Sequence, residues 1–70
     1  MEKITLAAAR VNAGLSLQEV ADKINKDRST ISNWERGKVE MRVKDFLTLC
    51  KLYNVPMDSI ILPTTLHKVE

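Results

Sequence analysis

The side chains best equipped for chemistry lie close together in the middle of this chain, and their chemistry is hydrogen bonding. One arginine, two serines and one asparagine fall within a single short predicted helix, at Arg28, Ser29, Ser32 and Asn33. The same helix has Ile31 and Trp34 three residues apart, so these two share one side and predict an anchor in a core. A helix of about two to three turns is not stable alone in water. The rest of the chain must hold it and leave its polar faces free for a partner.

Basic side chains gather around this helix. Residues 23 to 44 contain seven Lys or Arg and three Asp or Glu, a local charge of +4, whereas the whole 70-residue chain carries only +2. The remainder is therefore weakly acidic. A basic centre in an acidic frame favours a polyanion as partner, and an ordinary solvated surface is the alternative.

Other kinds of chemistry have little support in the composition. The chain has one cysteine, Cys50, and one histidine, His67, so it can form neither an internal disulfide nor a zinc ligand set. No nucleophile with a base, phosphate-binding loop or carboxylate pair stands out, so we predict no catalytic residues, no metal and no cofactor. No run approaches the roughly 20 apolar residues of a membrane span and no secretion signal is evident, which predicts a cytoplasmic protein.

Apolar spacing divides the chain into five predicted helices and indicates an all-α protein. We expect one domain over residues 1–62 and a C-terminal tail over residues 63–70. The start and stop signals place the helices at about residues 5–13, 17–24, 28–36, 42–54 and 57–62. The signals include a capping box from Ser16 to Glu19, a left-handed turn at Asn25, a cap at Asp27 and a glycine stop at Gly37.

Two groups of apolar residues are predicted to form the core. Only three or four residues separate the second helix from the third, so the two must cross steeply, with the small Ala21 at the crossing. Val20, Ile24, Ile31 and Trp34 would form the seam of this helix-turn-helix unit. Most of the remaining core is expected from one amphipathic helix, through Val43, Phe46, Leu47, Cys50 and Tyr53.

Residues 4 to 62 resemble the DNA-binding domain of phage repressor and Cro-like helix-turn-helix regulators, the XRE-type family. The resemblance rests on four segments, which are Gly14-Leu15-Ser16, Glu19-Val20-Ala21, residues 29–38 and residues 49–58. It implies a five-helix lambda-repressor-like fold with the helix-turn-helix at helices 2 and 3. It also implies a sequence-specific regulator of transcription, in the first place a repressor, that inserts helix 3 into the major groove of double-stranded DNA.

The same resemblance assigns roles to individual residues. The positions that match the base-reading residues are Arg28, Ser29, Ser32 and Asn33. Contacts to DNA phosphates are implied for Ser16, Gln18, Arg36, Lys38 and Arg42. An ion pair between Arg10 and Glu35 is implied between the first and third helices. Leu17 departs from the family, which favours glutamine there, and its side chain cannot hydrogen-bond DNA.

Regulators of this kind act as symmetric dimers on half-sites about 34 Å apart, so we expect a homodimer on a palindromic operator. The C-terminal region has more apolar side chains than a small core needs, which places the predicted dimer interface at Ile60, Ile61, Leu62 and Leu66. The alternative function is a protein-interaction module of antitoxin or anti-repressor type, with DNA binding secondary. The basic third helix favours DNA.

Overall fold

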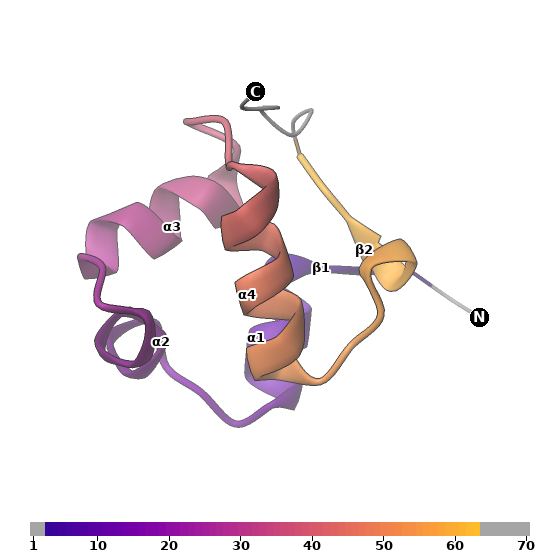
Figure 1. The fold of residues 1–70 in the computed structure, drawn as a ribbon, viewed down its shortest axis with the longest axis horizontal. Coiled ribbons are helices and arrows are strands. Elements are labelled where there is room, and N and C mark those ends of the chain that lie inside the picture. The colour runs from indigo at the N-terminus through magenta and orange to yellow at the C-terminus, as the bar shows by residue number, and fades with distance from the viewer. Residues whose placement is uncertain (1–2, 64–70) are drawn as a thin grey trace.

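The computed structural model describes residues 3–63, and within them it has four α-helices, a 3-10 turn and a two-stranded sheet (Figure 1). In chain order the elements are β1 (Ile4–Thr5), α1 (Leu6–Asn12), α2 (Leu17–Ile24), α3 (Arg28–Arg36), α4 (Val43–Tyr53), η1 (Met57–Ser59) and β2 (Ile60–Ile61). The first four predicted helices are thus present, with each end within one residue of its expected position. The predicted tail lies almost entirely outside the described residues, so its boundary at residue 63 stays a prediction.

The helix ends follow the local chemistry of the sequence. Ser16 Oγ accepts a hydrogen bond from the Glu19 amide at 3.1 Å, and the Glu19 carboxylate accepts one from the Ser16 amide at 2.9 Å, which confirms the capping box. These hydrogen bonds hold the pKa of Glu19 below its ordinary value. Asn25 and Gly37 end α2 and α3 in the left-handed region, at φ 60° and 73°. Asp27 occupies the cap position of α3, but its side chain makes no capping hydrogen bond.

The predicted fifth helix is wrong, and the all-α class has to be corrected with it. Met57–Ser59 form only a 3-10 turn, after which Ile60–Ile61 pair in parallel with Ile4–Thr5. Ile60 is buried whereas Ile61 is 50% exposed, the alternation of a strand with one covered face. β-branched residues suit this conformation. The pairing joins the two ends of the described chain, so local periodicity carried no signal for it.

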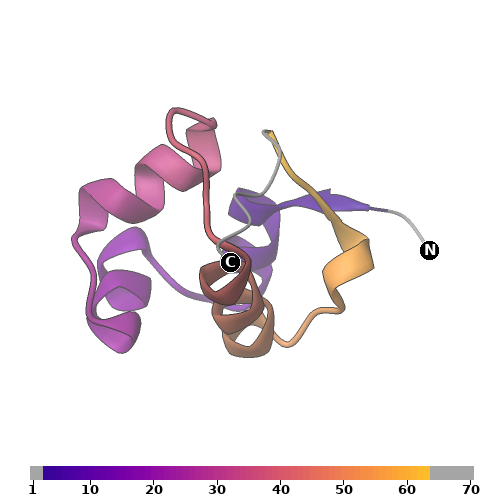
Figure 2. The same ribbon diagram turned by 45° about the horizontal axis from the view of Figure 1, so that its top comes forward.

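The helix-turn-helix unit packs as predicted. Val20, Ala21 and Ile31 are fully buried and Trp34 nearly so, with α2 lying against α3 in both views (Figures 1 and 2). Ile24 is partly buried against the same cluster. The small side chain of Ala21 lets the two helices approach closely at the crossing. α3 is therefore held along the side that bears Ile31 and Trp34.

The apolar face of α4 is shifted relative to the prediction. The buried side chains are Phe46, Leu49, Cys50 and Tyr53, whereas Leu47 is 38% exposed. Leu47 is thus not a core residue, and Leu49 takes the place assigned to it. The buried stripe starts at Phe46, and Val43 is only half-buried; α1 is among the elements that pack against α4. Met41, in the loop before α4, closes the core and is only 3% exposed.

The buried hydroxyl of Tyr53 generates a stability prediction. Within the described residues its Oη has no hydrogen-bond partner, and burial raises the pKa of Tyr53 to about 12. We expect Tyr53→Phe to leave the free energy of unfolding unchanged at pH 7, or to raise it by up to about 1 kcal/mol, because it removes an unpaired polar group. Urea unfolding at pH 7 measures this.

The same variant has an expected pH dependence. The pKa of the Tyr53 phenol is higher in the folded state, at about 12, than its ordinary value of 10. The contribution of this difference to stability is therefore complete below pH 10 and is lost as the pH rises to about 12. Tyr53→Phe should therefore lose less stability than the wild type between pH 9 and 11. A variant less stable than the wild type at pH 7 by more than about 1 kcal/mol would show that the hydroxyl has a partner.

Candidate nucleic-acid interface

The polar residues of α3 lie on the side opposite its anchor. Positions 28 and 32 are four residues apart, as are positions 29 and 33, and the two pairs are adjacent. All four positions therefore lie on one face of the helix. Arg28 and Ser29 are exposed, and Ser32 and Asn33 are half-buried. The structure thus brings the four predicted base-reading residues together. Arg28 comes first in the helix, at its exposed N-terminal end.

The predicted phosphate contacts lie at the end of α3, at the start of α4 and at the start of α2. Arg36 and Lys38 are exposed at the C-terminal end of α3, and Arg42 is exposed at the N-cap of α4, beyond the loop that follows. Ser16 and Gln18 lie at the N-terminal end of α2, which packs against α3. All five side chains are exposed, so each is accessible to a partner, as a contact to a DNA backbone would require.

Two of these residues already have partners inside the protein. Ser16 Oγ accepts the Glu19 amide, which leaves its own hydroxyl proton free to donate. Gln18 Nε2 donates to Asp22 Oδ1 at 2.9 Å, one turn further along α2. This bond uses one of two amide protons and fixes the orientation of the side chain. Gln18 can still donate the other proton, although Asp22 brings a negative charge close to it.

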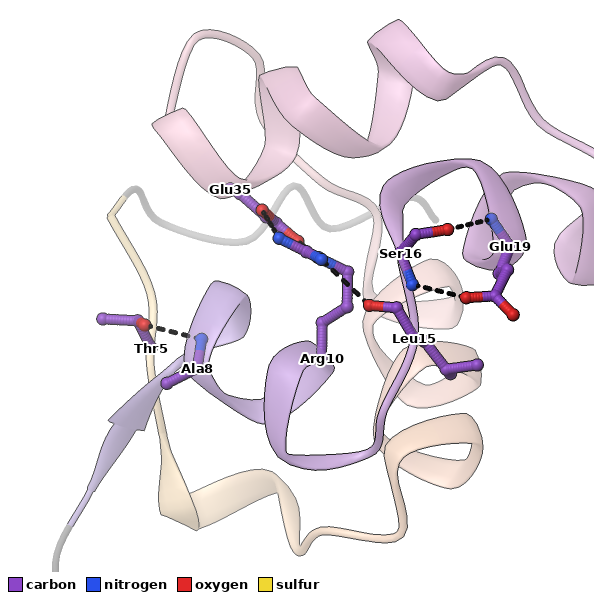
Figure 3. A network of polar contacts seen from close by, with 7 residues as sticks. All are labelled: Thr5, Ala8, Arg10, Leu15, Ser16, Glu19 and Glu35. Atoms are coloured by element: carbon purple, nitrogen blue, oxygen red, sulfur yellow. Dashed lines mark hydrogen bonds and ion pairs between the residues drawn. The ribbon is translucent and has the colours of Figure 1, made fainter.

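Arg10 of α1 contacts both α3 and the residue before the N-cap of α2 (Figure 3). Its Nε lies 2.7 Å from Glu35 Oε2 and its Nη2 lies 3.3 Å from Glu35 Oε1, so the ion pair between α1 and α3 is bidentate. The third nitrogen, Nη1, donates to the carbonyl oxygen of Leu15 at 2.9 Å. The side chains of Arg10 and Glu35 are 15% and 10% exposed. The hydrogen bond to Glu35 raises the pKa of Arg10 above its ordinary value.

The Leu15 contact is absent from the sequence prediction. The acceptor is a backbone carbonyl, which every residue has, so no residue type marks it. It matters because Leu15 directly precedes the N-cap of α2. The guanidinium of Arg10 therefore holds α3 through a side chain and the start of α2 through the backbone.

The residues predicted for the dimer interface have different environments. Ile60 is buried in the protein's own core, and Leu62 is half-buried against it. Neither has a freely exposed side chain. Ile61 is exposed. Leu66 lies outside the described residues.

The described residues hold no candidate metal site, and their one cysteine is shielded from solvent. From residue 3 to residue 63 there is no group of three or more His, Cys, Asp or Glu placed to hold a metal ion. Cys50 is buried, and burial raises the pKa of its thiol. In the same part of the chain, no helix is long and apolar enough to cross a membrane.

An anchored short helix with an outward polar face, packed against a preceding helix across a tight turn, defines a helix-turn-helix domain. The chain belongs to the helix-turn-helix family, which it matches over residues 6–60, and to the XRE type within it. This is a family of regulators and not of enzymes. A curated relative, the HTH-type transcriptional regulator ImmR of Bacillus subtilis, is 36% identical over 56 residues. The match covers 80% of this chain and 44% of ImmR, so the chain spans less than half the length of that relative.

The Arg10–Glu35 pair generates the next prediction. Arg10→Met and Glu35→Gln should each lower the free energy of unfolding by about 2 to 4 kcal/mol, because each leaves its partner largely buried without a counter-charge. The double variant should lose less than the sum of the two, since no unpaired charge remains. Urea unfolding at low and high salt measures all three.

A matched control is available in Lys44→Met, which removes an exposed cation from α4. It should change stability by less than about 0.5 kcal/mol. If Arg10→Met and Glu35→Gln each lowered the free energy of unfolding no more than the control does, the pair would behave as an exposed ion pair. The same would hold if their effects vanished in high salt.

Proposed function

We propose that this chain is a transcriptional regulator, in the first place a repressor, that recognises a specific sequence in double-stranded DNA. The observation that carries the proposal is the division of α3 into a buried apolar side and an exposed polar side. A helix held in this way can enter the major groove with its N-terminal end first. The transcriptional regulator ImmR, to which the chain is similar, supports the same class of function. A regulator acts where its DNA lies, so we propose a cytoplasmic location.

The base-reading residues differ in how much sequence they specify. Arg28 has a planar fork that can donate two hydrogen bonds to O6 and N7 of guanine, and Asn33 can pair with adenine. Ser29 and Ser32 have short side chains that accept several bases. Arg28 therefore carries the largest share of specificity, and Asn33 the next.

Affinity without sequence preference would come from the flanking residues. We propose phosphate contacts for the five exposed residues Ser16, Gln18, Arg36, Lys38 and Arg42. Such contacts orient the protein on the duplex and displace bound counterions. A single domain with a handful of contacts binds weakly. We therefore propose a symmetric dimer on a palindromic operator, with half-sites about 34 Å apart.

Replacement of the proposed reader can be compared with replacement of a proposed phosphate contact. Arg28→Ala should weaken binding to the selected operator by about 1 to 3 kcal/mol and leave binding to random duplex much less affected. Lys38→Ala should weaken binding to both about equally. The operator is obtained by selection from a random duplex pool, and affinities are measured by fluorescence anisotropy. If Arg28→Ala lowered the affinity for both duplexes equally, Arg28 would not be a base-reading residue.

Salt dependence separates DNA binding from the protein-interaction alternative. Five phosphate contacts in each subunit predict a slope of about −4 to −5 per subunit when the logarithm of the binding constant is plotted against that of the salt concentration. Titration of the same duplex at several salt concentrations measures the slope. Negligible salt-sensitive binding to any duplex would favour an interaction module.

A further inference from the structure

Asp27 occupies the N-cap of α3 without capping it. Its backbone dihedrals, φ −76° and ψ 148°, are those of a capping residue, and aspartate is among the residues preferred there. Its side chain nevertheless accepts no hydrogen bond from the first turn of α3. The carbonyl oxygen of Asp27 instead accepts a hydrogen bond from the Thr30 amide at 3.0 Å. A donor that a capping side chain often takes is therefore already used.

The carboxylate of Asp27 is available to a partner outside the protein. Asp27 is exposed, and within residues 3–63 its side chain has neither a hydrogen bond nor an ion pair. Lys26 and Arg28, its two neighbours in the chain, are exposed cations, and the carboxylate pairs with neither of them. Neither helix capping nor an internal ion pair therefore accounts for an aspartate at this place.

The turn that carries Asp27 has a fixed backbone. Asn25 is left-handed at φ 60°, and the Lys26 amide donates to the carbonyl oxygen of Ala21 at 2.9 Å. Asp27 follows directly and precedes Arg28, the first residue of α3. In the proposed function, on which this inference rests, that end of α3 enters the major groove first. The carboxylate would then come close to base edges.

Base edges in the major groove offer a carboxylate few hydrogen-bond donors. Guanine presents two acceptors, and thymine presents one acceptor and a methyl group. Adenine has an amino group, but its N7 acceptor lies beside it and would repel a second carboxylate oxygen. Cytosine presents the N4 amino group alone. We propose that Asp27 is a further base-reading residue, which accepts a hydrogen bond from N4 of a cytosine.

The cytosine is expected in the base pair next to the one that Arg28 reads. Successive Cα atoms are about 3.8 Å apart and successive base pairs about 3.4 Å, so neighbouring residues can reach neighbouring base pairs. Asp27 and Arg28 have opposite hydrogen-bonding chemistry. The half-site should therefore contain a guanine with a cytosine in an adjoining base pair, on either strand.

Asp27 would act mainly by rejecting other sequences. A carboxylate that faces acceptors on the bases loses its hydration and gains no hydrogen bond in return. It also repels the phosphates of any duplex. Asp27 therefore lowers the affinity for DNA in general and lowers it least where a cytosine supplies the donor, so that specificity rises through a penalty on the wrong partners.

Base preference provides the first test. Arg28→Ala locates the guanine, because that variant should lose its preference at one base pair. At an adjoining base pair the wild type should prefer cytosine to each other base by about tenfold. Asp27→Ala should lose most of this preference, keep the preference for guanine, and bind random duplex more tightly than the wild type. Fluorescence anisotropy with duplexes that differ at one base pair measures these affinities.

Asp27→Asn should change the preferred base. An amide offers one donor and one acceptor, the pattern that matches N7 and N6 of adenine, so adenine should replace cytosine as the preferred base. Asp58→Asn is the matched control, because it removes the same charge from η1, on the other side of α4 from α3 (Figures 1 and 2). Asp58 is also outside the residues predicted for DNA contacts and for the dimer interface. This variant should keep the preference for cytosine.

Thermal unfolding tests without DNA whether the carboxylate is available. Ser16→Ala removes a side chain that caps α2 through the Glu19 amide, so it should lower the melting temperature. Asp27→Ala removes no such hydrogen bond and should lower the melting temperature by less than half as much. Circular dichroism at pH 7 measures both variants.

The outcomes separate this inference from the proposed function. Binding with a guanine that depends on Arg28 but with no preference for cytosine beside it would overturn the role of Asp27 alone. A preference for cytosine that survives Asp27→Ala, or a loss of stability from Asp27→Ala as large as that from Ser16→Ala, would overturn it too. Absence of wild-type binding to any duplex would instead contradict the proposed function, and this inference with it.

Discussion

The guanidinium of Arg10 is the contact on which the arrangement of the helix-turn-helix depends. It holds Glu35 on α3 with two nitrogens and the carbonyl oxygen of Leu15 with the third. α2 and α3 are short, and neither would be stable by itself. Because one planar group reaches both, the helix-turn-helix cannot rotate on α1 without breaking charge-assisted hydrogen bonds that are largely shielded from water. Tyr53 of α4 lies close enough for this pair to affect its pKa.

α3 is held by an apolar contact as well as by this polar one. Ile31 and Trp34 bury one side of α3 and fix its distance from α2, while Glu35 fixes its rotation. The remaining side bears Arg28, Ser29, Ser32 and Asn33 on a support that packing has already made rigid. Pre-organisation of this kind matters for DNA, because hydrogen bonds to base edges require side chains at defined positions.

Within residues 3–63, α4 lies between two surfaces of different character. On one side lies the polar and basic face of α3, and on the other an apolar groove with Leu47 and Met57. The buried face of α4 holds the core between them. A partner on one of these surfaces would leave the other uncovered.

Local chemistry in the sequence determined the first four helices, the capping box, the left-handed turns and the side of α3 that is buried, because each depends on residues within about one turn of one another. The family resemblance supplied the pairing of Arg10 with Glu35. Tertiary structure decided the rest. It turned the predicted fifth helix into a strand beside residues 4 and 5, exchanged Leu47 for Leu49 in the core, and gave Arg10 a backbone partner. These depend on contacts between segments far apart in the chain, for which neither periodicity nor residue type carries a signal.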